Sequence, residues 1–240
     1  MCYRLRKSSP HWTSTKKICE TRDGDVARLM EENGKPLSAA DEQKEQARLT
    51  ELAGDPGKQR RRKQAEDADQ ARVLKVLRAM PAAFIYQYAG PSAGPDNGLA
   101  AKPGESPATR IEKFTFKPNP TFSAPDLETQ VLTQMAGEIW VDPVHLRVVR
   151  LVARLQQDVD FGWGILGRLN KGGWIEIDQA DVGPDMGVDQ WRTVHFQMVM
   201  SGRVVWKTRV FDTTEDESQY QPVPLGLGYQ KAIDLLRNDP

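Results

Sequence analysis

The sequence predicts an α+β protein, with a strongly curved antiparallel β-sheet whose concave apolar face is covered by helices. Stretches in both halves of the chain alternate between apolar and polar residues, which is typical of strands that bury one face. Good helix formers fill residues 38–80, and helices are the usual cover for such a face. A β-rich chain of 240 residues still fits one domain, so we expect residues 1–240 to form a single domain.

Strands are expected over residues 3–33. The segment Trp12–Thr21 is rich in threonine, and Asp23-Gly24 separates it from a second extended run. This dipeptide predicts a hairpin, because both central residues of a type I′ turn need a positive φ angle. Asn33-Gly34 and Pro36 then close the section.

A helical insert of two helices is expected over residues 38–80. Ser38 is a candidate N-cap, Gly54 ends the first helix, and Pro81 ends the second. The second helix opens with the basic run Lys58–Gln64, whose preferred interpretation is a solvated helix face. The other interpretation is a patch for an anion or a phospholipid headgroup.

Glycine and proline occur throughout residues 89–108, which predicts a mobile loop. The loop need not separate two domains, because neither flanking segment is expected to fold on its own. A strand is expected before it, over Ala83–Tyr88, and another after it, over Ile111–Pro120. A helix then begins at Pro125, and Gly137 is expected to end it.

An antiparallel meander is predicted over residues 138–212. Its clearest alternation puts Val149, Leu151, Ala153, Leu155, Val159 and Phe161 on one face. Further strands begin near Trp174 and Trp191, and Ser201-Gly202 is expected to form a tight hairpin turn. Residues 213–228 are expected to form a loop, and residues 229–236 a final helix.

One glycine-rich segment is unusually apolar for a connection between strands. The stretch "DVDFGWGILGRLNKGGW" (residues 158–174) contains Phe161, Trp163, Ile165 and Leu166. An apolar hairpin of this kind is covered by its own protein, by a partner or by a lipid. Two interpretations therefore stay open: the hairpin folds back on the core, or it faces a membrane or a partner.

The sequence contains no arrangement of residues that predicts an enzyme, a metal site or a cofactor. The three histidines are not at metal-ligand spacing, and there is no G-x-S-x-G nucleophile motif. Gly162, Gly164 and Gly167 spell G-x-G-x-x-G, but no helix follows them as a dinucleotide site requires. Cys2 and Cys19 can form one disulfide and are too few for a four-ligand zinc site.

The charge balance excludes strong attraction to nucleic acid or to an anionic membrane. Lys plus Arg and Asp plus Glu are 33 each, so the formal net charge is zero. The sequence contains no run of about 18 apolar residues, so no transmembrane helix is predicted. No apolar segment follows Met1, so no signal peptide is expected in this chain.

Four segments carry a resemblance to a group of bacterial envelope proteins: "ENGKPLSAADEQKEQARL", "FTFKPNPTFSAPDLETQVLTQMAGEIWVD", "DVDFGWGILGRLNKGGW" and "MSGRVVWKTRVFD". That group is similar to the outer-membrane lipoprotein-sorting proteins, the LolA/LolB-like superfamily. The resemblance runs from Tyr3 to Leu236. It implies an incomplete antiparallel barrel, closed on its apolar concave side by helices, that holds acyl chains and has no catalytic residues. We expect the chain to depart from this pattern by lacking the export signal and the first strand, and by carrying the basic run Arg60–Lys63.

The expected function is therefore non-catalytic binding of a lipid or lipoprotein in the periplasm or at the outer membrane, with acyl chains held between sheet and helices. The residues expected to line the site are Val149, Leu151, Leu155, Phe196, Met198, Met200 and Trp206. The residues expected to face a membrane or another envelope protein are Phe161, Trp163, Ile165 and Leu166. The alternative is a structural or interaction protein with the same fold, a permanently plugged core and no ligand.

Overall fold

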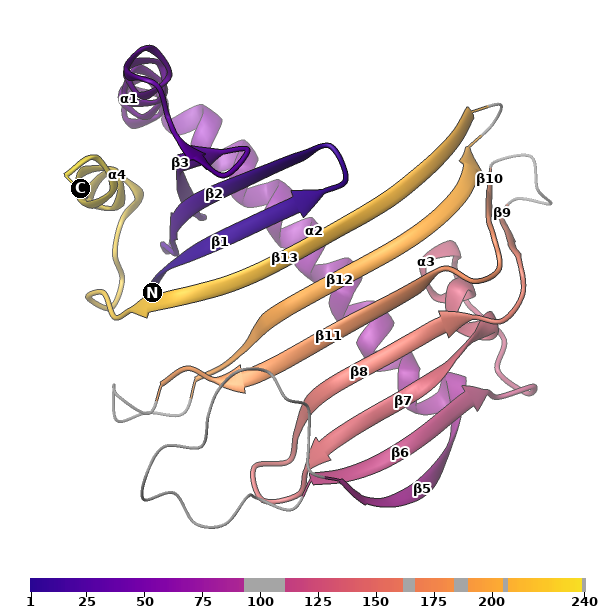
Figure 1. Ribbon diagram of the computed structural model, residues 1–240. Helices are drawn as coiled ribbons and strands as arrows, with labels where there is room; N and C mark the ends of the chain where they lie inside the picture. Colours follow the sequence, from indigo (N-terminus) through magenta and orange to yellow (C-terminus); the bar gives the residue numbers. More distant parts are fainter. Residues whose placement is uncertain (93–110, 162–166, 184–189, 205–206, 239–240) are drawn as a thin grey trace. The chain divides into compact units, whose positions relative to one another are not determined.

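The computed structural model describes residues 1–92, 111–161, 167–183, 190–204 and 207–238 (Figure 1). The helices in these ranges are α1 (Ala39–Gly54), α2 (Pro56–Ala83), α3 (Leu127–Gln130), the 3-10 helix η1 (Val131–Gln134) and α4 (Tyr229–Arg237). The strands up to the long gap are β1 (Cys2–Ser9), β2 (Trp12–Cys19), β3 (Val26–Glu32), β4 (Lys35–Pro36) and β5 (Phe84–Ser92). After it come β6 (Ile111–Pro118), β7 (Met135–Asp142), β8 (Arg147–Leu155), β9 (Val159–Phe161), β10 (Gly167–Leu169), β11 (Trp174–Asp181), β12 (Trp191–Val204) and β13 (Lys207–Gln221).

The described strands hydrogen-bond in the order β4-β3-β2-β1-β13-β12-β11-β8-β7-β6-β5, and β10 pairs with both β12 and β9. The ends of this order, β4 and β5, do not pair with each other, so the described strands form an open sheet and no closed barrel. The predicted α+β class with a large antiparallel sheet is confirmed.

The chain divides into two compact units. Unit 1 contains residues 1–73 and 214–240, and unit 2 contains residues 74–184 and 189–213. Helix α2 and strand β13 each contribute residues to both units. The single domain expected from the sequence stays a prediction.

The strands of unit 1 are joined by tight turns. Asn33 and Gly34 have φ angles of 52° and 72°, which is the type I′ geometry that joins β3 to β4. The type I′ turn predicted at Asp23-Gly24 is wrong, because only Gly24 has a positive φ angle. There the hydroxyl of Thr21 holds the turn, since it donates to the carbonyl of Gly24 and accepts from the N–H of Asp23.

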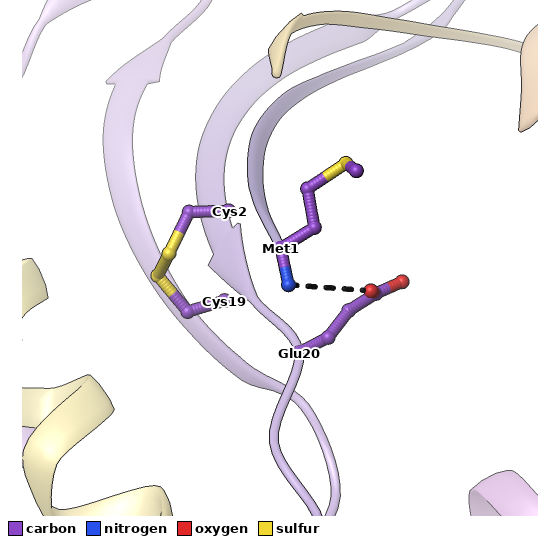
Figure 2. The surroundings of a disulfide bond; sticks show 4 residues. All are labelled: Met1, Cys2, Cys19 and Glu20. Carbon is purple, nitrogen blue, oxygen red and sulfur yellow. Dashed lines mark ion pairs between the residues drawn. A yellow bond between two sulfur atoms is a disulfide. The ribbon is translucent and has the colours of Figure 1, made fainter. Parts of the chain in front are cut away.

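A disulfide joins the first two strands of unit 1. Cys2 and Cys19 lie directly opposite each other in the pairing of β1 with β2, and they form a disulfide (Figure 2). The Met1 amino group lies 3.6 Å from the carboxylate of Glu20 beside it. Both cysteines are buried. The disulfide therefore links two neighbouring strands from inside the core of unit 1.

The core of unit 1 is built by helices α1 and α4. Four buried side chains of these helices pack with Val26 of β3 and with the disulfide. They are Leu49 and Leu52 of α1 and Ile233 and Leu236 of α4. Buried polar groups fix the same helices. Arg28 donates to the carbonyl of Leu236 at 2.7 Å and to the carboxylate of Glu42 at 2.9 Å, and Glu45 accepts from the N–H of Leu29 at 2.8 Å.

Strand β13 is longer than the sequence predicts, so the loop expected over residues 213–228 is wrong for residues 213–221. The reason is charge pairing with β1. Arg6 faces Asp216 in the register, and Lys7 faces Glu215, whose carboxylate lies 2.6 Å from the lysine nitrogen. A polar strand stabilised by opposite charges across the pair shows no apolar alternation.

The hairpin turn predicted at Ser201-Gly202 is also wrong, because both residues lie within β12. Gly202 faces Leu169 of β10, and a Cβ atom at Gly202 would lie 2.4 Å from the carbonyl oxygen of Arg168. The glycine therefore permits the close approach of β10. Residues 205–206, which join β12 to β13, lie outside the described residues.

Two predicted helix ends differ from the structure. Helix α2 continues past Pro81 to Ala83. The helix expected from Pro125 to Gly137 is reduced to α3 and η1, and Gly137 lies inside strand β7. A Cβ atom at Gly137 would lie 1.9 Å from the carbonyl oxygen of Val152 in β8, so this glycine also serves a close strand contact and ends no helix.

Candidate functional site

Two apolar rows cross six strands on one face of the sheet in unit 2. The strand register aligns the first row as Phe196, Ile177, Leu151, Ile139, Phe114 and Tyr88. It aligns the second row as Met198, Ile175, Ala153, Gly137, Phe116 and Tyr86. Directly opposed residues share a face of a sheet, so these side chains form one continuous apolar surface.

Helical residues of unit 2 pack against the hydrophobic cluster that contains part of these rows. Val76, Ala79 and Met80, near the end of α2, pack against the cluster that contains Leu151 and Phe116. Leu132 of η1 belongs to the same cluster. Because they recur at positions i, i+3 and i+4, the α2 residues present one stripe of the helix to the sheet.

The structure places six of the seven predicted lining residues. Val149, Leu151 and Leu155 are buried and alternate along β8, as the sequence predicts. Met200 in β12 is also buried. Phe196 and Met198 in the same strand are only partly buried. Trp206 lies outside the described residues. The lining role of these residues stays a prediction.

The predicted apolar hairpin is described only at its base. Phe161 ends β9 and is partly buried against the apolar cluster of unit 2. Trp163, Ile165 and Leu166 lie outside the described residues. Arg168 of β10 forms ion pairs with Asp160 at 2.6 Å and Asp158 at 3.3 Å, which supports the pairing of β9 with β10.

Sequence reasoning left two central residues out of the predicted lining. Ile177 lies between Leu151 and Phe196 in the first row, and Ile175 lies between Ala153 and Met198 in the second. Their alternation with Glu176 and Asp178 was a visible signal. The sequence does not show, however, that β11 separates β8 from β12.

The opposite face of the same sheet carries a row of charged and aromatic side chains. Lys113, Trp140, Arg150, Asp178 and His195 follow one another across five strands. Lys113 and Arg150 lie 4.8 Å and 5.7 Å from the centre of the Trp140 ring, which is cation–π geometry. Arg150 also forms an ion pair with Glu176.

Asp178 is the member of this polar row whose charge is least favourably placed. It is 5% exposed, its Oδ2 lies 3.6 Å from Arg150, and its Oδ1 has no hydrogen-bond partner among the described residues. Burial raises the pKa of Asp178 above its usual range and Glu176 raises it further, while Arg150 and His195 oppose the rise. The folded state therefore favours the protonated carboxyl, so ionisation of Asp178 at neutral pH costs stability.

We expect Asp178→Asn to raise the free energy of unfolding at pH 7 by on the order of 1 kcal/mol, because it removes a buried and poorly paired charge. The gain should shrink as the pH falls toward 4, since the wild-type carboxyl then binds its proton. Urea unfolding of both proteins between pH 4 and pH 7 measures this difference in the free energy of unfolding. The control Asp234→Asn, at an exposed position, should change stability by less than about 0.5 kcal/mol. A loss of stability at pH 7 in Asp178→Asn would contradict this account.

The described part of the chain is expected to hold no metal site. No cluster of three or more His, Cys, Asp or Glu side chains there could hold a metal ion. His145 pairs with Asp142 at 2.7 Å, at the turn after β7. In the basic run, Lys58 pairs with Glu51 and Lys63 with Asp67, as on a solvated helix face.

Among the described residues, no helix is long and apolar enough to cross a membrane. Comparison with known protein families, with curated proteins and with solved structures gives no match for this chain. The candidate site therefore rests on the geometry of the apolar rows alone.

Proposed function

We propose that the protein binds an acyl chain of a lipid or lipoprotein on the apolar rows of unit 2, without catalysis. The observation that carries the proposal is that these rows are continuous across six strands, yet are left partly accessible at Phe196, Met198 and Ile177. An acyl chain is long, flexible and apolar, and each buried methylene contributes about 0.8 kcal/mol. A row of apolar side chains supports such a ligand along its length.

The apolar side chains of β12 suit a flexible ligand. Met198 and Met200 have unbranched, polarizable side chains that adapt to irregular apolar shapes. Phe196 offers a broad apolar ring one residue pair away from Met198 on the same face. We propose that the α2 residues Val76 and Met80 form the helical side of the site, so that the chain is held between sheet and helix.

We propose the bacterial envelope as the place of action. A disulfide between buried cysteines persists in oxidising compartments such as the periplasm and is rare in the cytosol, and Cys2 and Cys19 form one. The resemblance to outer-membrane lipoprotein-sorting proteins points to the same place, with lipid, lipoprotein acyl chains or another envelope protein as the partner.

We expect the purified protein to bind the fluorescent fatty acid cis-parinaric acid, and Phe196→Ala to weaken this binding about tenfold by removing apolar contact area. Fluorescence titration measures both dissociation constants. The matched control is Gln197→Ala, which truncates the neighbouring residue of β12 on the opposite face and should leave the affinity unchanged.

Failure of the wild-type protein to bind the fatty acid would contradict the proposal. It would favour the alternative of a structural or interaction protein, which the packing of Val76, Ala79 and Met80 on the sheet also fits. If Phe196→Ala and Gln197→Ala weaken fatty-acid binding equally, the binding site lies away from the apolar rows.

A further inference from the structure

Three consecutive arginines near the start of α2, Arg60, Arg61 and Arg62, form an arginine patch on unit 1. None of the three forms a hydrogen bond or an ion pair with any residue that the structure describes. Arg60 and Arg61 are exposed, and Arg62 is half-buried. The lysines at either end of the basic run differ from them, because each pairs with a carboxylate. The guanidinium groups of the patch are therefore available to an anionic partner.

The carboxylates close to the patch in the sequence are already engaged within the chain. Each of four accepts a hydrogen bond or forms an ion pair; they are Glu51, Asp55, Glu66 and Asp67. Residues 55–67 contain five basic and three acidic side chains, so this segment carries a net charge of +2. The positive charge of the patch is therefore not cancelled locally, although the whole chain is neutral.

Helix stability does not explain the basic run. The N-terminus of a helix is the positive end of its dipole, so acidic side chains stabilise the first turn and basic ones oppose it. Helix α2 begins at Pro56 and has no acidic residue in its first turn. Because the basic residues give the helix no electrostatic benefit, interaction with a partner is favoured as their role.

A completely exposed leucine belongs to a loop that is held near the same end of α2. The side-chain amide of Gln59 donates to the carbonyl of Asp23 at 2.9 Å. The N–H of the preceding Arg22 donates to the carbonyl of Leu227 at 3.2 Å. Leu225 lies two residues before Leu227, and its side chain is fully exposed. One turn therefore connects the start of α2 with a loop that presents an apolar side chain.

We propose that the arginine patch and Leu225 dock unit 1 onto a membrane surface that contains anionic phospholipids. Guanidinium groups bind phosphate oxygens through paired hydrogen bonds, and an anionic leaflet attracts each nearby arginine. Leu225 gains apolar burial among lipid chains, which neither a nucleic acid nor a soluble anion offers. The docking uses residues of unit 1 alone, so it goes beyond the acyl-chain site proposed on unit 2.

Co-sedimentation of the full chain with vesicles tests the proposal. We expect the protein to bind vesicles of phosphatidylglycerol and phosphatidylcholine, and to bind vesicles of pure phosphatidylcholine at least about tenfold more weakly. Raising the salt concentration from about 0.05 M to about 0.5 M should release the protein, because salt shortens the reach of the arginine charges.

A triple substitution tests the arginine patch itself. Arg60→Gln, Arg61→Gln and Arg62→Gln together should lower the affinity for the anionic vesicles about tenfold or more. The matched control removes three positive charges at exposed positions of β2, β4 and β6; its substitutions are Lys16→Gln, Lys35→Gln and Lys117→Gln. The control should lower the affinity by less than about twofold, since only charges near the membrane surface contribute strongly.

Two single substitutions separate the leucine from the acyl-chain site. Leu225→Ser should weaken binding to the anionic vesicles about fivefold, because an apolar side chain no longer enters the lipid. Phe196→Ala should leave vesicle binding unchanged, so failure of the acyl-chain proposal is distinguishable from failure of this one.

The absence of binding to the anionic vesicles, or equal binding to both kinds of vesicle, would overturn the proposal. Equal losses in the two triple variants would also overturn it, because the attraction would then be a general effect of charge. Release by inorganic phosphate at an ionic strength where chloride has no effect would show a site for free phosphate in place of a membrane surface.

Discussion

Gly137→Ala is expected to lower the free energy of unfolding by about 3 kcal/mol or more. The added Cβ atom would lie 1.9 Å from the carbonyl oxygen of Val152 and 2.9 Å from the Cα atom of Ala153. Both atoms are backbone of β8, so they cannot turn away as a flexible side chain does. Strands β7 and β8 must separate, which breaks the sheet that carries both apolar rows.

Denaturant unfolding followed by tryptophan fluorescence measures this loss, because Trp140, Trp174 and Trp191 all lie in unit 2. The matched control is Gly54→Ala, since a Cβ atom there would meet no described residue within 4 Å apart from its chain neighbours and its own helix backbone. Alanine at such a helical glycine should stabilise by about 0.4–1 kcal/mol. A loss below about 1 kcal/mol in Gly137→Ala would show that β7 and β8 are farther apart than the structure has them.

Removal of the disulfide by the double substitution Cys2→Ala and Cys19→Ala is expected to cost about 3 kcal/mol of stability. The bond closes a segment with a sequence separation of 17, and cross-linking a loop of this length lowers the entropy of the unfolded chain by about that amount. Circular dichroism during urea unfolding measures the cost in unit 1.

A reducing agent supplies the control for this prediction. It should lower the stability of the wild-type protein toward that of the double variant and leave the variant unchanged. Wild-type protein that is equally stable with and without reductant would contradict a stabilising disulfide. It would also weaken the argument that places the protein in an oxidising compartment.

The parts of the fold that the sequence predicts are those fixed by local pattern. The alternation from Val149 to Leu155 predicts the buried face of β8, because a half-buried strand repeats every two residues. Ser38 is the N-cap of α1, and its hydroxyl accepts from the N–H of Asp41 as a capping residue does. Both features depend only on neighbours in the chain.

The incorrect predictions concern residues whose role depends on a distant strand. Gly137 and Gly202 look like helix or turn signals, but each permits a close approach of another strand. The acidic end of β13 looks like a loop until its pairing with the basic residues of β1 is known. Local sequence shows which residue is a glycine or an acid, and not which strand lies opposite it.

The sequence likewise predicts only part of the candidate site. Alternation places Leu151, Phe196 and Met198 on apolar faces, but only the register shows that Ile175 and Ile177 lie between β8 and β12 in the same rows. The polar row with Asp178 and Arg150 on the opposite face likewise depends on the strand order. Strand order is a long-range property, which one sequence does not specify by periodicity.

Native mass spectrometry of the protein purified from a bacterial envelope, with lipid extraction of the same sample, tests whether the protein carries an acyl chain. We expect a mass above 27.0 kDa by one phospholipid or acylated peptide, with the same molecule recovered in the extract. We also expect this added mass to be reduced in Phe196→Ala and retained in Gln197→Ala. A wild-type protein that carries no lipid and takes up no fatty acid would contradict the proposed acyl-chain site.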